Sequence, residues 1–390
     1  MGHHSPQFME SFAKLIATPS ISSIDSSLDQ SNRAVTELLA NWLEDLDFSV
    51  EILPVNQQAD KVNMIACLGS GEGGLVLSGH TDTVPCNPEY WQQDPFKLTE
   101  KDNRLYGLGT SDMKCFFSIV IDVLAKMDLK NLHEPLYILT TADEESNMAG
   151  ARALVDSGRR LGRYALIGEP TGLIPINMHK GILMESIKLT GRSGHSSNPA
   201  LGNSALEGMY TVIGALMEWR NKIQKTYVNE NFSVPVPTMN FGSIRGGDNP
   251  NRICAECLLT IDLRLLPEME HETIKTELYQ VVNQSLKDSG LTVNIEPLFC
   301  GVPAMHTDAS AGIVRLAEQL AGHSASTVAF GTEGPYLNSM GMETVILGPG
   351  DIDQAHQANE YLALERIKPM MNILTGMIGH ICIGENKNVN

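Results

Sequence analysis

The 390-residue sequence predicts an α/β protein, with a mostly parallel sheet flanked by helices and an inserted α+β domain. Three observations predict this architecture. Short apolar segments alternate with amphipathic helical segments in the first half, half-exposed strand patterns replace them after about residue 182, and the first rhythm resumes after about residue 297. We therefore expect a main domain formed by residues 1–182 and 297–390, with residues 183–296 inserted into it.

The main domain is expected to contain buried strands that alternate with helices, the pattern of a largely parallel sheet. The expected strands are residues 75–77, 136–139, 164–167 and 344–347. The expected helices are residues 32–46, 111–127 and 309–320. Thr110 or Ser111 is expected to cap the second of these helices, because hydroxyl side chains favour that position.

The inserted segment follows the order β-α-β-β-α-β, which is typical of the ferredoxin-like split-βαβ fold. Its expected strands are residues 184–190, 238–244, 253–264 and 291–297. Its expected helices are residues 204–225 and 271–287. Because surface loops tolerate insertions, this segment is expected to interrupt the main domain without disturbing its sheet.

Composition excludes some classes of partner and predicts a cytoplasmic location. The formal net charge of −18 argues against nucleic acid and anionic membranes as partners, because both require basic surfaces. No apolar run approaches the ~18 residues of a membrane span, and the first residues do not form a basic region followed by an apolar one, as an export signal would. Seven scattered cysteines, an odd number, are typical of a reducing compartment.

Cys254 and Cys257 form a C-x-x-C pair within the expected strand of residues 252–264. Residues three apart on a strand point to opposite faces. We therefore expect that these two thiols do not share a metal ion.

Side chains of the metal-ligand type follow the expected strands of the main domain, at their carboxyl ends. They are His80 and Asp82 after residues 75–77, Glu144 and Glu145 after residues 136–139, Glu169 after residues 164–167, and His356 after residues 344–347. Asp112 joins them from the expected loop-to-helix turn of residues 107–114. The carboxyl edge of an open α/β sheet is where sites form, so these groups are expected to converge.

Taken singly, each residue has an ordinary explanation as a turn former, a cap or a surface side chain. A cluster of them needs cations, because adjacent carboxylates repel one another and otherwise take up protons. Imidazole and carboxylate ligands together suit Zn²⁺ or Co²⁺. Two ions sharing a bridging carboxylate, with a free carboxylate beside their water, form the site of a two-metal hydrolase.

Four ordered signatures resemble those of the M20 metallopeptidase and deacylase family, and the resemblance covers nearly the whole chain. The signatures are Ser78–Pro85 (SGHTDTVP), Asp112–Lys114 (DMK), Asp143–Glu145 (DEE) and Gly168–Thr171 (GEPT). The resemblance implies a zinc-exopeptidase-like catalytic domain that carries a lid, which often forms a homodimer. It also implies two divalent ions per chain, Zn²⁺ or Co²⁺, and raises glutathione as a further cofactor.

The resemblance implies a role for each residue of the cluster. His80 and Glu169 would hold one ion, Glu145 and His356 the other, and Asp112 would bridge them. Asp82 would orient His80, and Glu144 would be the general acid and base.

Five further residues are candidates to meet the substrate or the reacting carbonyl. His195, in the loop Gly191–Ser197, would donate to the oxyanion, the alternative being a histidine bonded to its own serine-rich turn. Asn251 with Arg252 or Arg264 would bind the substrate carboxylate, although Arg264 could equally form a strand-end ion pair. Glu333 would bind a free ammonium group.

Additional motifs resemble the deacetylase branch of the family. They are residues 139–150, 179–181, 246–254, 331–335 and 354–361. They imply release of acetate from an N-acetylated amino acid such as N2-acetylornithine, a step of arginine biosynthesis. Cys115 stands where the family usually has Gly, and Cys254 stands where many members have Pro.

Several alternatives share part of this pattern. A succinyl-diaminopimelate desuccinylase or a di- or tripeptidase would use the same metal ligands. An inactive binding homologue would be expected to lack Glu144 or a ligand, and this sequence lacks none. A zinc-stabilised structural protein would prefer closely spaced cysteines and histidines.

Overall fold

The computed structural model describes residues 6–55 and 60–384, and its internal contacts divide the chain into two compact units. Unit 1 comprises Met1–Asn177, Thr307–Ser326 and Thr332–Asn390, and unit 2 comprises Met178–His306 and Thr327–Gly331. Residues 1–5, part of the segment predicted to lack an export signal, lie outside the described residues. None of the described helices has the length and hydrophobicity that a bilayer crossing requires.

The main sheet has a parallel centre and antiparallel edges, and its strands follow the order β1-β2-β6-β3-β7-β15-β8, with β13 and β14 pairing with β8. The strands are β1 (Ser49–Pro54), β2 (Val62–Leu68), β3 (Leu75–His80), β6 (Leu136–Thr141), β7 (Tyr164–Ile167), β8 (Ile176–His179), β13 (Met305–His306), β14 (Ser326–Val328) and β15 (Glu343–Ile346). β3 runs parallel to β6 and β7, and β15 runs parallel to β7. The predicted parallel arrangement is confirmed for the four central strands β6, β3, β7 and β15, which end at one edge.

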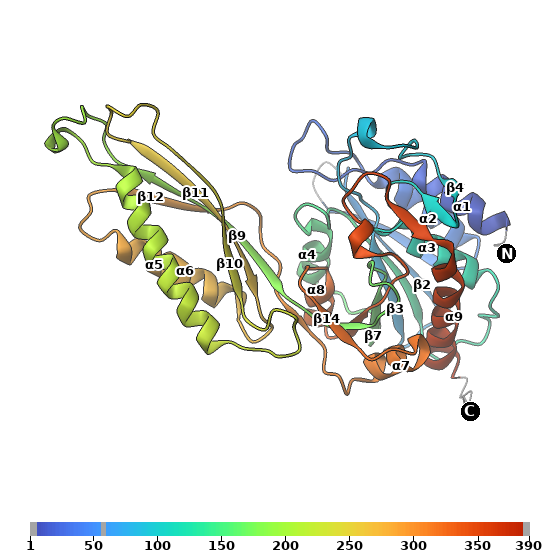
Figure 1. Cartoon of the computed structure of the whole chain (residues 1–390). Coiled ribbons are helices and arrows are strands. Elements are labelled where there is room, and N and C mark those ends of the chain that lie inside the picture. Colours follow the sequence, from blue (N-terminus) through green and yellow to red (C-terminus); the bar gives the residue numbers. More distant parts are fainter. Residues whose placement is uncertain (1–5, 56–59, 385–390) are drawn as a thin grey trace. The chain divides into compact units, whose positions relative to one another are not determined.

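Helices cover both faces of this sheet (Figure 1). They are α1 (Pro6–Ile16), α2 (Arg33–Glu44), α3 (Lys114–Leu124), α7 (Gly312–Ala321) and α9 (Ile367–Ile378) on one face, and α4 (Ala149–Asp156) and α8 (Gly334–Ser339) on the other. Every residue of α3 is buried, and its sequence is accordingly apolar apart from Lys114, Ser118 and Asp122. A smaller sheet of order β16-β5-β4 is formed by Tyr361–Ala363, Arg104–Tyr106 and Thr99–Lys101.

Unit 2 has the predicted order β-α-β-β-α-β. Its elements are β9 (Gly181–Thr190), α5 (Ala205–Thr226), β10 (Thr238–Gly246), β11 (Glu256–Leu265), α6 (His271–Ser285) and β12 (Thr292–Pro297). The sheet order is β10-β11-β9-β12, with all neighbours antiparallel, and α5 and α6 pack against the sheet (Figure 1). The helix predicted over residues 204–225 is confirmed as α5, and Ser204 caps it, because its hydroxyl accepts a hydrogen bond from the Glu207 N–H at 3.3 Å.

The start of α3 differs from the prediction. The helix begins at Lys114, three residues after Ser111, and neither Thr110 nor Ser111 caps it. The physical reason is a distant acceptor: the buried Glu360 carboxylate accepts hydrogen bonds from the backbone N–H groups of Gly109, Ser111 and Asp112. This carboxylate holds residues 109–112 as a loop instead of a helical turn.

The expectation about Cys254 and Cys257 was also based on a wrong element boundary. β11 begins at Glu256, so Cys254 precedes the strand. Both cysteines are buried in the same hydrophobic core of unit 2, and their side chains do not diverge to opposite faces of a strand. Among the described residues, neither belongs to a group that could hold a metal ion.

Candidate metal centre

The parallel strands of unit 1 bring polar side chains to one edge of the sheet. His80 is the last residue of β3, and Asp82 follows it by two positions. Glu144 and Glu145 come after the end of β6, and Glu169 follows β7 by two residues. Because β3 lies between β6 and β7, these groups come from three adjacent strands.

The Asp112 carboxylate lies between two imidazoles. Its Oδ1 is 3.1 Å from His80 Nε2, and its Oδ2 is 3.4 Å from His356 Nε2. His80 and Asp112 are buried, whereas the His356 side chain is half exposed. One carboxylate that faces a different imidazole with each oxygen has the arrangement of a ligand that bridges two ions.

Two glutamates complete the cluster. Glu145 Oε2 lies 2.9 Å from His356 Nε2, and Glu169 Oε1 lies 3.6 Å from His80 Nε2. Ligands about 2.0–2.2 Å from a tetrahedral ion are separated from one another by roughly 3.3–3.6 Å. The described residues contain two candidate sets of ligand atoms that lie within 4.8 Å of one another, one with Glu144 and Glu169 beside His80, the other with Asp112 and Glu145.

The charges of this cluster fit a site for cations. Burial and neighbouring carboxylates raise the pKa of both Glu144 and Glu169 well above their usual range. Hydrogen bonds to Asp112 and Glu145 raise the pKa of His356 to about 11. They outweigh the partial burial of the ring, which by itself lowers the pKa. Protons would therefore occupy this cluster in the absence of a cation, and metal binding would release them.

Two buried oxygens in the cluster have no hydrogen-bond partner among the described residues. They are Glu169 Oε1 and Asp82 Oδ1. A buried carboxylate oxygen without a partner is costly. The Glu169 oxygen faces His80, so an ion shared with His80 would satisfy it, and the donor set fits the implied metal.

Asp82 lies close to His80 but contacts it mainly through its backbone. His80 Nδ1 donates to the Asp82 carbonyl oxygen at 2.9 Å, while the nearer carboxylate oxygen is 3.7 Å away. This bond places the proton on Nδ1 and leaves Nε2 as the coordinating nitrogen. The Asp82 carboxylate instead accepts a hydrogen bond from the backbone N–H of Glu145 at 3.1 Å, so it links two loops of the site.

Glu333 is buried beneath the same sheet edge. Its carboxylate accepts a hydrogen bond from the Ser78 hydroxyl and another, of 2.6 Å, from the Thr141 hydroxyl. Ser78 belongs to β3 and Thr141 is the last residue of β6. The structure thus places this predicted substrate-binding residue where it joins the two strands that carry His80 and Glu144.

The predicted site residues of unit 2 lie together in two loops but form local contacts. His195 is exposed, and its Nδ1 accepts hydrogen bonds from the Ser197 N–H at 3.2 Å and from the Ser197 hydroxyl at 2.8 Å. A β-bridge joins His195 to Arg252, and the Ser196 N–H donates to the Asn251 carbonyl. Arg252 pairs with Asp248 at 2.7 Å.

Arg264 lies near the end of β11, apart in sequence from those loops. It forms an ion pair with Asp262 at 3.2 Å, and both side chains are partly exposed. This contact is the strand-end ion pair that the sequence left open as an alternative.

Several buried polar residues around the cluster carried no predicted role. Glu360 holds the loop of Asp112, and its position four residues after His356 in the motif of residues 354–361 could have indicated it. Lys61 and Asn63 hold the loop of Glu144 and Glu145, and no local sequence pattern marks either residue.

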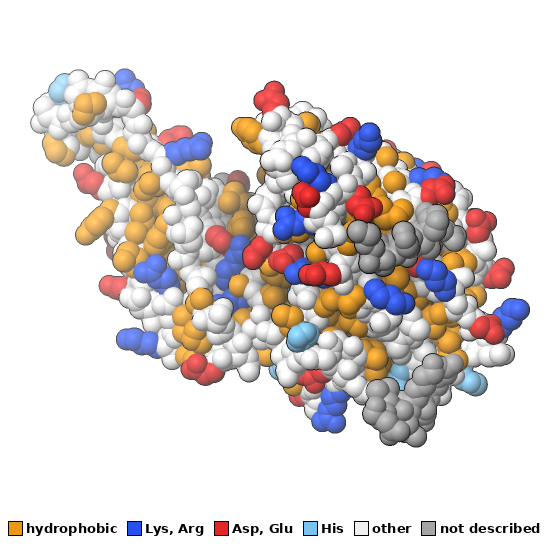
Figure 2. Space-filling view, turned by 45° about the vertical axis from the view of Figure 1, so that its right-hand side comes forward, with side chains coloured by type: hydrophobic (Ala, Val, Ile, Leu, Met, Phe, Trp, Pro, Cys, Tyr) orange, Lys and Arg blue, Asp and Glu red, His pale blue; other side chains and the backbone are white. Residues whose placement is uncertain are grey.

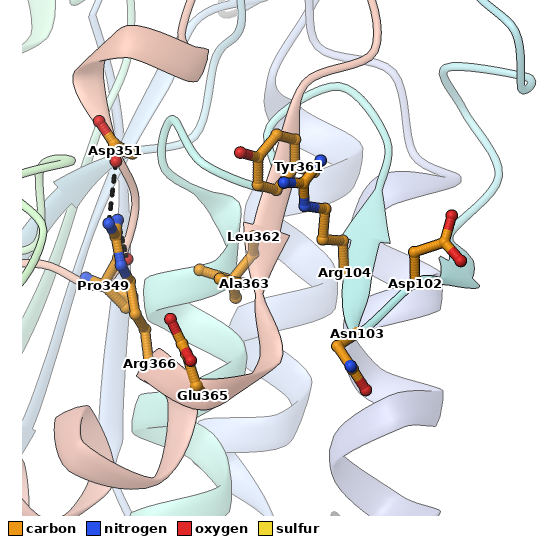
Figure 3. A pocket seen from close by; sticks show the side chains of 10 residues that line it. All are labelled: Asp102, Asn103, Arg104, Pro349, Asp351, Tyr361, Leu362, Ala363, Glu365 and Arg366. Atoms are coloured by element: carbon orange, nitrogen blue, oxygen red, sulfur yellow. Dashed lines mark hydrogen bonds and ion pairs between the residues drawn. The ribbon is translucent and has the colours of Figure 1, made fainter.

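A separate cavity of about 290 Å³ lies beside β5 and β16 (Figure 3). None of the predicted metal ligands lines it. Its two cationic side chains are engaged: Arg366 pairs with Asp351 at 2.9 Å, and the Arg104 guanidinium stacks 4.1 Å from the Tyr361 ring centre. The cavity is therefore distinct from the metal cluster.

Comparison with known proteins identifies a family. The model of peptidase family M20/M25/M40 matches residues 76–380. Acetylornithine deacetylase of Pasteurella multocida is 45% identical over 379 residues, which are 97% of this chain and 99% of that protein. Acetylornithine deacetylase of Edwardsiella ictaluri is 47% identical over 382 residues, covering 98% and 100% of the two chains.

Solved structures share the fold at low sequence identity. A tripeptidase from Staphylococcus aureus superposes with a TM-score of 0.73 at 20% identity, covering 95% of this chain and 97% of that chain. The YXEP protein of Bacillus subtilis, described as a dinuclear metal binding peptidase from the M20 family, superposes with a TM-score of 0.65 at 14% identity, covering 95% and 96%. The chain therefore belongs to peptidase family M20/M25/M40, as a metal-dependent amide hydrolase.

Proposed function

We propose that the chain hydrolyses N2-acetyl-L-ornithine to L-ornithine and acetate, a step of arginine biosynthesis, with two divalent ions bound in unit 1. The observation that carries the hydrolytic part is the Asp112 carboxylate, which faces His80 with one oxygen and His356 with the other. The choice of substrate is supported by relatives named acetylornithine deacetylase, which are 44–47% identical over nearly their full length.

The proposed ligands follow the geometry of the cluster. His80 and Glu169 would hold one ion, Glu145 and His356 the second, and Asp112 both. Ions bound there would polarise the acetamide carbonyl and increase the acidity of a water molecule. We infer Zn²⁺ or Co²⁺ from the mixture of imidazole and carboxylate donors.

Glu144 is the proposed general acid and base. It accepts the proton of the attacking water and returns it to the amine as the tetrahedral intermediate breaks down to acetate and ornithine. Its place beside His80 and Glu169, at the end of β6, supports this assignment. It forms no part of the five-ligand set, which leaves it available for proton transfer.

His195 is proposed to donate a hydrogen bond to the oxyanion. Its Nδ1 accepts from the Ser197 N–H, so in the neutral ring the proton is on Nε2. The exposed side chain therefore presents an N–H donor, which an oxyanion requires.

The amino-acid part of the substrate is proposed to bind through Asn251 and Arg252 or Arg264. Arg252 is exposed, and its partner Asp248 lies at the surface, so a substrate carboxylate could replace that partner. For Glu333, both carboxylate oxygens already accept hydroxyl hydrogen bonds. A role in binding the ammonium group would require at least one of these bonds to rearrange.

Acetate release from N2-acetyl-L-ornithine tests the proposed function. We expect activity that a chelator removes and that Zn²⁺ or Co²⁺ restores. A panel containing N-succinyl-diaminopimelate, dipeptides and tripeptides distinguishes the related activities, and faster turnover of any of these would overturn the substrate assignment. Parallel assays with and without glutathione test that cofactor, which is supported by the family resemblance alone.

We also propose that the chain forms a homodimer through unit 2. α5 exposes Leu206, Tyr210 and Met217, which share one face of the helix, and Tyr210 is 82% exposed. Hydrophobic side chains are visible along the part of the surface formed by unit 2 (Figure 2). Exposed apolar stripes of this kind are typical of protein interfaces, and sedimentation of the wild type and of a Tyr210→Glu variant tests the proposal.

A cytoplasmic location is proposed from the cysteines. All seven are free thiols, and four of them are buried. This arrangement is typical of proteins from reducing compartments. Cell fractionation would test it.

A further inference from the structure

The first residues of β2 meet the loop that carries Glu144 and Glu145. Lys61, which directly precedes β2, is 4% exposed. Its ammonium nitrogen lies 2.8 Å from Asp143 Oδ1 and 2.7 Å from Asp29 Oδ1. Asp143 is the residue immediately before Glu144.

Asn63, the second residue of β2, holds both ends of the same loop. Its side-chain amide donates to the Gly150 carbonyl at 2.9 Å and accepts from the Ala142 N–H at 3.1 Å. A side chain at position 150 would not fit, because a Cβ there would lie 2.5 Å from Asn63 Oδ1. The absence of a side chain at Gly150 therefore allows the Asn63 amide to bond to both ends of the loop, a contact called here the Asn63 clamp.

Asp143 occupies an unusual backbone conformation that its neighbours maintain. Its φ is +59°, in the left-handed region that residues other than glycine seldom adopt. Its carboxylate accepts from Lys61 and also from the Ser22 hydroxyl at 2.8 Å, and its carbonyl accepts from the Met148 N–H at 2.7 Å. Both the side chain and the main chain of Asp143 are thus fixed.

This turn determines where the next two side chains point. Glu145 reaches His356 at 2.9 Å, and Glu144 lies among the ligand atoms around His80. Lys61 remains charged despite its burial, because its bonds to Asp143 and Asp29 raise its pKa. It neutralises Asp143 from the side of β2.

We propose that Lys61 and Asn63 are positioning residues for Glu144 and Glu145, acting through the turn at Asp143. The proposal rests on the metal site described under the proposed function. Ser22, Asp29, Lys61 and Asn63 all precede residue 76, where the match to the family model begins. The support of this turn therefore comes from the N-terminal segment of the chain, outside the matched region.

Lys61→Met tests the proposal, with Lys126→Met as its matched control. Lys126 also pairs with a buried aspartate of unit 1, Asp122 on α3, but contacts no part of the turn. Each substitution leaves a buried carboxylate without its lysine. The Lys126 side chain is 56% exposed and that of Lys61 only 5%, so Lys61→Met is expected to destabilise the protein more. Unfolding free energies in urea are therefore measured for both variants, so that a loss of stability is separated from misplacement of the two glutamates.

Three quantities are measured on each purified protein: kcat and KM for N2-acetyl-L-ornithine, Co²⁺ affinity, and the visible absorption spectrum of the Co²⁺-loaded protein. For Lys61→Met we expect kcat and the Co²⁺ affinity of the site proposed at Glu145 and His356 to fall about tenfold, with KM within about threefold and an altered spectrum. For Lys126→Met we expect all of these to match the wild type. Wild-type values in Lys61→Met, or equal losses in both variants, would overturn the proposal.

If Lys61→Met does not fold, Asp143→Asn takes its place. Asparagine tolerates the left-handed conformation but offers Lys61 and Ser22 a neutral acceptor, so the same reduction in Co²⁺ affinity and the same spectral change are expected. A wild-type protein that binds Co²⁺ but hydrolyses none of the substrates would overturn the proposed function, while the comparison of Co²⁺ affinities would still decide the role of Lys61.

Discussion

The predicted site residues of unit 1 and those of unit 2 are held in contrasting ways. In unit 1, His80, Asp112 and Glu169 are buried, and their partners come from strands and loops far apart in sequence. In unit 2, His195 and Arg252 are exposed, and their side chains bond to Ser197 and Asp248, two and four residues away. Long-range partners fix a geometry before a ligand arrives, whereas local surface contacts can be exchanged for contacts to a ligand.

The contrast suggests that the two units contribute differently to catalysis and to substrate binding, and substitutions can test this. Changes in unit 1 should mainly lower kcat, because the geometry of the reacting groups is built there. In unit 2, a change at His195 should lower kcat, because His195 is proposed to contact the transition state. Changes at the other predicted residues of unit 2 should raise KM, because those residues are proposed to bind the substrate.

The largest effect is expected for Glu144→Gln. The amide keeps the shape of the side chain but cannot accept a proton from water, so kcat should fall by about 10²–10⁴-fold. Metal content, measured by atomic emission on the purified variant, should stay at the wild-type level. Full activity in this variant would refute the assigned role and weaken the view that unit 1 holds all the proton-transfer chemistry.

His195→Ala should have the next largest effect. Loss of one donor to the oxyanion lowers kcat by about 10²–10³-fold in other hydrolases. We expect that range here, with KM changed much less, in initial-rate measurements over a range of substrate concentrations. A variant that loses only binding would place His195 with the substrate-anchoring residues of unit 2.

Arg252→Gln should raise KM about tenfold while kcat stays within about threefold, because a charge-assisted contact to the substrate carboxylate is removed. Arg245→Gln is the matched control, since Arg245 is an exposed arginine of β10 in the same unit. Equal KM values in the two variants would show that Arg252 is not part of the binding surface.

The last prediction concerns the stability in acid of the main sheet, in which His179 is the last residue of β8. Burial lowers the pKa of His179 to about 4, below its ordinary value of 6.5. The unfolded chain therefore binds this proton first, and the free energy of unfolding should decrease as the pH falls from 6.5 to 4, by up to roughly 1.4 kcal/mol per pH unit. Urea unfolding at several pH values should show a shallower decrease for His179→Gln, and identical slopes would contradict the assignment.

Patterns within short segments predicted the six elements of the β-α-β-β-α-β order in unit 2, four strands and three helices of unit 1, and the polar cluster at the sheet edge. They did not predict the helices α1, α4, α8 and α9 or the strands β1, β2, β8 and β13. Apolar strands followed by polar residues indicated His80, Glu145 and Glu169, because the strands that carry them are parallel and end together. The order of elements in unit 2 followed from periodicity in the same way.

Features that depend on distant partners could not be predicted from local patterns. The loop before α3 is held by Glu360, 248 residues from Asp112, and the clamp on the Glu144 loop comes from Asn63, 79 residues from Ala142. The hydroxyl partners of Glu333, on β3 and β6, were hidden for the same reason. The partners of such buried polar groups come from distant segments, so they can be identified only when the fold is known.

The inserted unit separates His356 from the other proposed ligands along the chain, and this has a consequence for synthesis of the protein. A ribosome completes positions 80, 112, 145 and 169 first, then the whole of unit 2, and only afterwards the segment with His356. A nascent chain thus carries an incomplete ligand set for most of its synthesis. The proposed second ion would find its full set of donors only after the segment with His356 has been made.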